Sequence, residues 1–337
     1  MSVTCPNCGK TLSDEAVLCD ACGCSTLSME EPASASPPPR TRRKWPWILA
    51  ALLLLAVMAS AAAGGLWYYH RQHGGFSTAP GSSEPGTSSG EPVSRTVRVT
   101  IPEGYTADRI AEQLEEAGVC TAVEFYEAVQ TADFSDYLFV AAIPADSGRA
   151  CRLEGYLFPD TYEFYRGSTG EAAVRRFLDN FQNRLAPYKE QLAADGRSLE
   201  EVVILASLIQ WEAGYAEDMS RVSRVLCNRL DNPAEYPRLQ CDSTYRYISE
   251  WNAARSGVEL EEAAYDTYVR RGLPAGAISN PGLTALRAAL SPSDEEALRG
   301  CYFFATDYTT GITYYSRTYA EHVAVCREHG IGIHARD

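Results

Sequence analysis

The chain has 337 residues, of which 45% are apolar and 22% are charged. These values are ordinary for a chain that buries a hydrophobic core, and they exclude wholesale disorder. The net charge is −14, and the first 44 residues contribute none of it because five basic and five acidic side chains cancel there. The rest of the chain is therefore strongly acidic, which argues against nucleic acid as a partner bound through its phosphates.

Four cysteines near the start form two Cys-x-x-Cys pairs, Cys5 with Cys8 and Cys19 with Cys22. A tetrahedral zinc ion takes four such thiolates, and so short a segment cannot build a core without a metal. Disulfides are the alternative, but they do not suit a reducing cytoplasm. We therefore expect residues 1–26 to form a small N-terminal zinc ribbon that holds one structural zinc.

An uncharged apolar run extends from Ile48 to Trp67, with further aromatic residues beside both ends. As a helix it would be about 30 Å long, the thickness of the hydrocarbon core of a bilayer. The run is too long and begins too late for a cleaved signal peptide. We expect a single transmembrane helix at 45–69, between a linker at 27–44 and a flexible tether at 70–95.

The charges beside this run predict its orientation. Basic residues are concentrated directly before the run, and few follow it. By the positive-inside rule, the N-terminus is cytoplasmic and the large acidic region is extracytoplasmic. The sequence thus predicts a single-pass protein of the cell membrane.

The segment 96–150 predicts a strand followed by two helices. Apolar residues alternate with polar ones from Val97 to Ile101, which is typical of a strand. Thr121 and Glu124 have the spacing of a capping box at the start of the second helix. This pattern resembles a LysM-like subdomain, which suggests contact with glycan. A plain packing unit fits the pattern equally well.

An aromatic-rich segment from Leu153 to Phe164 follows, and it is interrupted by Gly155 and Pro159. We expect it to form strand and loop with exposed rings, which would suit sugar binding. The alternative is that the rings belong to the core.

A helix from about Leu199 to Ala213 carries the main chemical signal. Ser198 and Glu201 form a second capping box, and Gly214 is a plausible stop. Leu205, Leu208 and Ile209 predict an apolar stripe along this helix.

Glu212 follows Leu205 by seven residues and therefore lies on the same face as the stripe. Burial there would raise the pKa of its carboxyl and suit a general acid. The alternatives are a glutamate that turns out to solvent, or one that pairs with Arg221 or Arg224.

A series of motifs occurs in a fixed order along the same region. They are Leu153 to Phe164, Leu205-Ala-Ser-Leu-Ile-Gln-Trp-Glu212, Asn228-Arg-Leu230, Leu239-Gln-Cys-Asp-Ser-Thr244, Tyr265-Asp-Thr-Tyr268, Gly272-Leu-Pro274, Ile278-Ser-Asn-Pro-Gly282, Ala285 to Pro292, Tyr302-Phe-Phe and Glu321-His322. Together they closely resemble the YceG-like family, the membrane-anchored endolytic murein transglycosylases. The resemblance covers about residues 96–326.

The resemblance implies an α+β outer region, with a LysM-like piece followed by a catalytic domain at 151–330. It implies cleavage of the β-1,4 bond between N-acetylmuramic acid and N-acetylglucosamine in nascent peptidoglycan strands, leaving 1,6-anhydro ends. Glu212 matches the family's catalytic acid, and the reaction needs no cofactor. The implied partners are glycan strands, the cytoplasmic membrane and cell-wall synthesis proteins. The residues implied to line the glycan groove are Gln240, Asp242, Thr244, Tyr268, Asn280, Glu321 and His322, although each could equally be structural.

The chain departs from the family pattern at a few positions. Family members usually have glutamate where Gln210 stands, proline where Ser243 stands and asparagine where Asp266 stands. An inactive glycan-binding scaffold of the cell-wall synthesis machinery is therefore one alternative function.

The other alternative is a muramidase hydrolase. Ordinary glycosidases use two carboxylates at a defined separation. Asp218, Asp242 or Glu321 could be the partner of Glu212 in such an enzyme.

Overall fold

The computed structural model describes residues 2–4, 11–13, 95–144, 147–255 and 260–333. The four expected zinc ligands, the linker and the membrane span lie outside these ranges, and so does the tether except for residue 95. Of the expected head, only two short antiparallel strands are described, β1 (Ser2–Thr4) and β2 (Thr11–Ser13). Within the described ranges, no helix is long and apolar enough to cross a membrane. The same ranges contain no group of three or more His, Cys, Asp or Glu side chains that could hold a metal ion.

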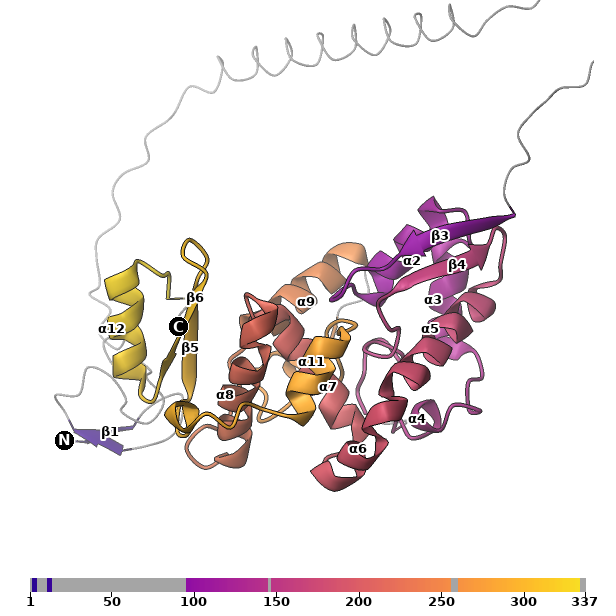
Figure 1. The fold of residues 1–337 in the computed structure, drawn as a ribbon. Helices are drawn as coiled ribbons and strands as arrows, with labels where there is room; N and C mark the ends of the chain where they lie inside the picture. Colours follow the sequence, from indigo (N-terminus) through magenta and orange to yellow (C-terminus); the bar gives the residue numbers. More distant parts are fainter. Residues whose placement is uncertain (1, 5–10, 14–94, 145–146, 256–259, 334–337) are drawn as a thin grey trace, which may run out of the picture. The chain divides into compact units, whose positions relative to one another are not determined.

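The mixed helix and sheet architecture that the sequence predicts is confirmed, and its first unit joins two strands to a layer of helices (Figure 1). Antiparallel pairing places Val99 on β3 opposite Tyr162 on β4. β4 lies beyond residue 150, so the expected boundary between 96–150 and 151–330 cuts through this sheet. The elements of the unit are β3 (Thr96–Thr100), α2 (Ala107–Glu116), α3 (Ala122–Thr131), α4 (Leu138–Ala141), β4 (Thr161–Tyr165) and α5 (Gly170–Leu185).

Aromatic rings fill the core between this sheet and α5. Phe177 of α5 packs against Phe125 and Tyr162, with ring centroids 5.9 and 4.6 Å apart. Tyr156 is 1% exposed and Phe164 is 3% exposed. The expectation of exposed rings between Leu153 and Phe164 is therefore wrong, because β4 and the loop before it face this core.

Four helices form the centre of the molecule, and α7 lies among the other three. The capping box that the sequence predicts at Ser198 and Glu201 starts α7, as expected. Every residue from Val202 to Ile209 is buried, so α7 is apolar on all sides and not along one stripe. These helices are α7 (Leu199–Glu212), α8 (Met219–Asp231), α9 (Asp242–Ala254) and α11 (Leu283–Leu290).

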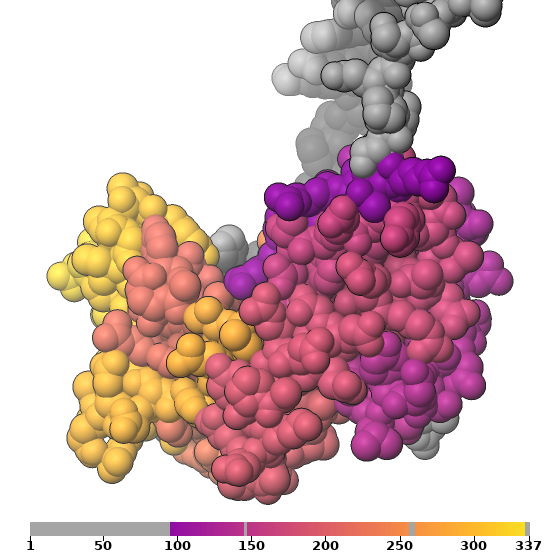
Figure 2. Space-filling view, turned by 45° about the vertical axis from the view of Figure 1, so that its right-hand side comes forward, coloured from indigo at the N-terminus to yellow at the C-terminus, as the bar shows by residue number. Residues whose placement is uncertain are grey.

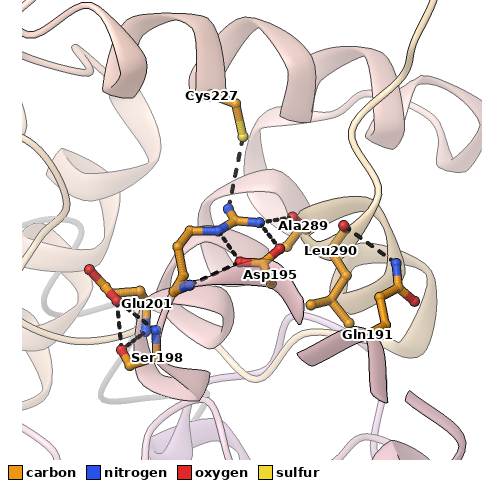
Figure 3. A network of polar contacts seen from close by, with 8 residues as sticks. Gln191, Asp195, Ser198, Glu201, Cys227, Ala289 and Leu290 are labelled. Carbon is orange, nitrogen blue, oxygen red and sulfur yellow. Dashed lines mark hydrogen bonds and ion pairs between the residues drawn. The ribbon is translucent and has the colours of Figure 1, made fainter. Parts of the chain in front are cut away.

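Polar contacts tie the start of α7 to its neighbours (Figure 3). Asp195 accepts hydrogen bonds from the Arg197 guanidinium, which also donates to the carbonyl oxygen of Ala289 at 2.8 Å. Ala289 belongs to α11, and α11 packs along α7. The contacts therefore fix where the long buried helix begins. The short elements around them are η2 (Ala186–Tyr188), α6 (Lys189–Asp195), η3 (Ala216–Asp218), α10 (Glu262–Tyr265) and η4 (Glu296–Leu298).

The described C-terminal part of the chain is a hairpin backed by a helix. β5 (Phe303–Asp307) and β6 (Ile312–Ser316) pair antiparallel, and α12 (Tyr319–His329) packs on both. The yellow C-terminal residues gather at one side of the face shown in Figure 2, next to the central helices. β5 also contacts α8, which joins the hairpin to the central helices.

Gly170 provides a test of this packing, because it begins α5 where that helix crosses α3. A Cβ at this position would overlap the backbone carbonyl of Glu124. We expect Gly170→Ala to destabilise the fold by about 1–3 kcal/mol, the usual range for overpacking. Thermal denaturation should show a clear fall in Tm for this variant. Gly332→Ala is the control, since no atom lies within 4 Å of a Cβ there; equal melting of the two variants would contradict the packing described.

Candidate active site

The last turn of α7 is held on two sides by loops from distant parts of the chain. Trp211 donates its indole N–H to the carbonyl oxygen of Gly104 at 2.9 Å. The side-chain amide oxygen of Gln210 accepts from the backbone N–H of Gly282, also at 2.9 Å. Gly104 has a φ of 80°, and a Cβ on it would lie 3.0 Å from the Trp211 ring nitrogen. Gln210 and Trp211 are thereby held in place, and so is the backbone of the residue that follows them.

That residue is Glu212, the last residue of α7. Its side chain is half-buried, and Oε1 accepts a hydrogen bond from the backbone N–H of Ser243 at 3.0 Å. Ser243 lies in the first turn of α9, where backbone N–H groups have no partner within the helix. The carboxyl group is therefore held where the end of one helix meets the start of another.

Burial raises the pKa of the Glu212 carboxyl, and the charge of Asp242 acts in the same direction. The hydrogen bond from the backbone N–H of Ser243 and the positive charge of Arg229 oppose this rise. The net direction is upward, which keeps the carboxyl protonated closer to neutral pH. A carboxyl with these properties can donate a proton and then, as the anion, accept one.

Arg229 is the buried cation of this site and is only 6% exposed. Its guanidinium donates to the carbonyl oxygen of Leu239 at 3.1 Å and to the side-chain oxygen of Gln240 at 3.0 Å. Gln240 has a φ of 56°, which makes it the one non-glycine residue with positive φ in the described chain. Left-handed backbone is costly for such a residue and persists where neighbours hold it. Arg229 thus holds the loop that leads into α9.

Two further residues expected at the site come together beside Ser243. Asp242 is exposed at the start of α9, and its Oδ1 accepts from the Tyr268 hydroxyl at 2.7 Å. Asp242 and Tyr268 are close enough to interact electrostatically with Glu212, and Gln240 is linked to the site through Arg229.

Two other residues expected in the groove are fully buried. Asn280 accepts from the backbone N–H groups of Gly155 and Leu157 at 2.8 and 2.9 Å, and its NH₂ donates to Tyr105 and Glu154. Thr244 is also fully buried, and its hydroxyl donates to the carbonyl oxygen of Cys241. These hydrogen bonds link buried segments of the chain to one another. The expectation that Asn280 and Thr244 line the groove is therefore wrong, and both have a structural role.

Glu321 and His322, the last pair expected in the groove, lie on the helix behind the hairpin. Glu321 completes the capping box of α12 with Thr318. His322 stacks on Phe303, with ring centroids 5.6 Å apart, and burial lowers its pKa. Both side chains have local structural partners, Glu321 is exposed and His322 is half-buried, and their contact with glycan stays a prediction.

Of the three carboxylates considered as partners of Glu212, only Asp242 is placed beside it. Asp218 is buried, and its two oxygens accept from the hydroxyls of Thr313 and Tyr315 at 2.7 and 3.3 Å. Glu321 is occupied by the α12 cap.

Sequence reasoning missed two buried charges, Arg229 and Glu154. Glu154 is 1% exposed, accepts from the backbone N–H of Ala107 at 3.0 Å, and has a pKa raised to about 8 by burial. Both residues lie within motifs of the sequence analysis, which made no prediction of their burial. An ionisable residue inside an apolar motif is the signal that could have found them.

The Ser243 N–H provides a direct test of the electrostatics. Proline lacks this donor and is tolerated in the first turn of a helix, so Ser243→Pro removes one hydrogen bond that favours the Glu212 anion. We expect the pKa of Glu212 to rise in this variant, as measured by ¹³C NMR titration of the side-chain carboxyl. Ser243→Ala keeps the N–H and should change the pKa less. A Pro variant with an unchanged or lowered pKa would show that this contact does not matter.

Comparison with known proteins agrees with this architecture. The sequence profile described as the YceG-like family matches residues 84–328. An endolytic murein transglycosylase of Streptococcus pneumoniae is 29% identical over 259 residues, covering 71% of this chain and 45% of the relative. One of Bacillus subtilis is 31% identical over 174 residues, covering 50% of this chain and 46% of the relative.

The chain thus spans about half the length of the curated relatives it matches. A crystal structure of a yceG-like protein from Listeria monocytogenes superimposes with a TM-score of 0.56 at 27% identity, covering 68% of this chain and 75% of that one. Because the family profile matches most of its length, this chain belongs to the YceG-like family.

Proposed function

We propose that this protein is an endolytic lytic transglycosylase that cleaves peptidoglycan glycan strands at the β-1,4 bond after N-acetylmuramic acid. The observation that carries the proposal is the Glu212 carboxyl, half-buried at the end of a rigid helix with a raised pKa. The relatives from S. pneumoniae and B. subtilis, which carry the name endolytic murein transglycosylase, support it.

In the proposed reaction Glu212 acts twice. It first donates its proton to the glycosidic oxygen, and the bond from that oxygen to C1 of the muramyl residue breaks. The resulting carboxylate then takes the proton of the muramyl C6 hydroxyl, whose oxygen bonds to C1. The products are a 1,6-anhydro end and a new N-acetylglucosamine hydroxyl, and the glutamate is regenerated without consuming water.

The surroundings of Glu212 suit both steps. Burial favours the protonated form that the first step needs, while the Ser243 N–H and Arg229 stabilise the anion that the first step leaves. Opposing influences of this kind keep the pKa of an acid–base group close to the working pH.

The departure at Gln210 does not favour an inactive scaffold. The Gln210 side chain accepts a hydrogen bond from Gly282 through its carbonyl oxygen, which a glutamate oxygen would do equally well. Ser243 provides a donor to Glu212 that a proline could not. Neither departure removes a group that the proposed reaction uses.

A hydrolase is the second candidate, and the proximity of Asp242 favours it. Asp242 is exposed, and its charge acts on Glu212. In a hydrolase it would activate water or attack C1, and the product would be an ordinary reducing end.

The catalytic test is Glu212→Gln, which keeps the size of the side chain but removes its transferable proton. We expect anhydro-muropeptides from purified sacculi, measured by mass spectrometry, to fall by at least about 10²- to 10⁴-fold, the usual contribution of acid–base catalysis. Glu217→Gln is the matched control, because Glu217 is a nearby exposed carboxylate. Asp218 is unsuitable as a control since it anchors the hairpin. Wild-type cleavage by the Gln variant would refute the mechanism.

We further propose that the enzyme works at the membrane surface. Residues 45–69 would cross the cytoplasmic membrane once, with the N-terminus inside the cell. The tether at 70–95 would keep the catalytic region near newly made strands and near cell-wall synthesis proteins. The unit formed by β3, α2, α3 and β4 would be the LysM-like subdomain. It would contact glycan through its exposed surface beside β3 and β4.

A zinc site in the cytoplasmic head is proposed from the paired cysteines alone. Metal analysis of the purified chain should give about one zinc per molecule. Serine at any one of the four pair positions should abolish binding, because each supplies one of the thiolates. Cys24→Ser is the control, since Cys24 stands outside the pairs. Loss of zinc from that variant alone would contradict the assignment. The proposed ligands are Cys5, Cys8, Cys19 and Cys22.

A further inference from the structure

The tip of the β5–β6 hairpin packs against the segment that directly follows Glu212. A Cβ built on Gly214 would lie 2.8 Å from Thr306 Cγ2 and 3.2 Å from a ring carbon of Tyr308. From the other direction, a Cβ on Gly311 would lie 3.4 Å from the Tyr215 ring. α7 ends at Glu212 with Ala213 as its C-cap, so the stop expected at Gly214 is confirmed, although Gly214 has no positive φ. Its lack of a side chain instead allows the hairpin to approach.

Tyr308 consequently lies beside the chain segment that leaves Glu212. Two residues of chain reach at most about 7 Å, so Gly214 lies within that distance of Glu212 along the backbone. One edge of the Tyr308 ring lies where a side chain on this glycine would stand, yet 72% of the residue is exposed. An aromatic ring is thus presented beside the segment that follows Glu212, with most of its surface open to solvent.

The support beneath Tyr308 is rigid. The Asp307 carboxylate accepts from the backbone N–H of Thr309 and the hydroxyl of Thr310 at 2.8 and 2.7 Å, which fixes the tip. Farther down the hairpin, Thr313 donates to buried Asp218 at 2.7 Å. Asp218 lies in η3, just beyond Gly214, so both sides of the hairpin are tied to the chain that leaves Glu212.

An exposed ring on a fixed support has a defined chemical use at a carbohydrate site. One face of a pyranose carries axial C–H groups, and the electron-rich face of an aromatic ring attracts them. Tyrosine offers this surface at low cost in conformational entropy, because few rotatable bonds are fixed on binding.

We propose that Tyr308 stacks on a sugar ring of the glycan strand, one position away from the bond that Glu212 cleaves, with the β5–β6 hairpin forming that wall of the groove. This inference rests on the proposed function and names a substrate-binding residue for it. Tyr215, packed under Gly311, supports the tip. None of the other groove residues expected from the sequence lies on this hairpin.

The binding test uses the full-length chain in detergent with Glu212→Gln, so that substrate is held and not cleaved. The probe is a tetrasaccharide of alternating N-acetylglucosamine and N-acetylmuramic acid, titrated by calorimetry. Tyr308→Ala should weaken its affinity about tenfold, which corresponds to about 1.4 kcal/mol. Tyr308→Phe keeps the ring and should bind as the parent does. Ile333→Ala removes a 39% exposed apolar side chain that lies outside the hairpin and outside the β3–β4 unit, and it should have no effect.

The kinetic test uses the same substitutions with Glu212 intact. Tyr308→Ala should raise KM for glycan about tenfold and leave kcat nearly unchanged, as expected for binding equal in ground and transition states. If the wild type cleaves glycan but Tyr308→Ala has an unchanged KM and an unchanged affinity, this inference is wrong and the proposed function still stands. Failure of the wild type to cleave and of the Gln variant to bind would overturn the proposed function, and this inference with it.

Discussion

The position of one carboxyl group depends on the burial of α7. From Val202 to Ile209 this helix has no exposed side, and contacts with α8, α9 and α11 enclose it. A helix packed in this way cannot rotate or slide without displacing several neighbours, since protein interiors are close-packed. Its final turn is then held by Gly104 and Gly282, which come from loops far apart in the sequence. The backbone of Glu212 is held in place because the rest of α7, which precedes it, is held in place.

The chemistry of the site follows from where α7 ends. Glu212 stands at the edge of the apolar interior, where burial raises its pKa, while the first turn of α9 offers a backbone N–H that stabilises the anion. Arg229 adds a buried positive charge and holds Gln240 in left-handed backbone. The same carboxyl is therefore equipped to give and to recover a proton. A lytic transglycosylase needs this from one residue, whereas a hydrolase divides the task between two.

Local signals in the sequence predicted local structure well. The capping boxes at Thr121 and Ser198 are present because each depends on residues three positions apart. Predictions that depended on tertiary neighbours were less successful. The rings from Leu153 to Phe164 are buried by α5, which begins after them, and the partner strand of β3 lies beyond the expected boundary. Glu212 was singled out by its place on the helix, and the structure places it at the end of α7 with a raised pKa. Asn280 was expected at the glycan and instead joins buried loops. Nothing in a motif distinguishes a side chain that binds substrate from one that binds backbone.

The central claim is that Glu212 serves as both acid and base, with the muramyl C6 hydroxyl and not water as the nucleophile. Digestion of sacculi in H₂¹⁸O by the purified full-length chain tests this most directly, with product ends read by mass spectrometry. The account predicts 1,6-anhydro ends that are lighter by one water and carry no ¹⁸O. Reducing ends that carry one ¹⁸O at C1 as the first product would contradict it and would assign Asp242 the role of second carboxylate.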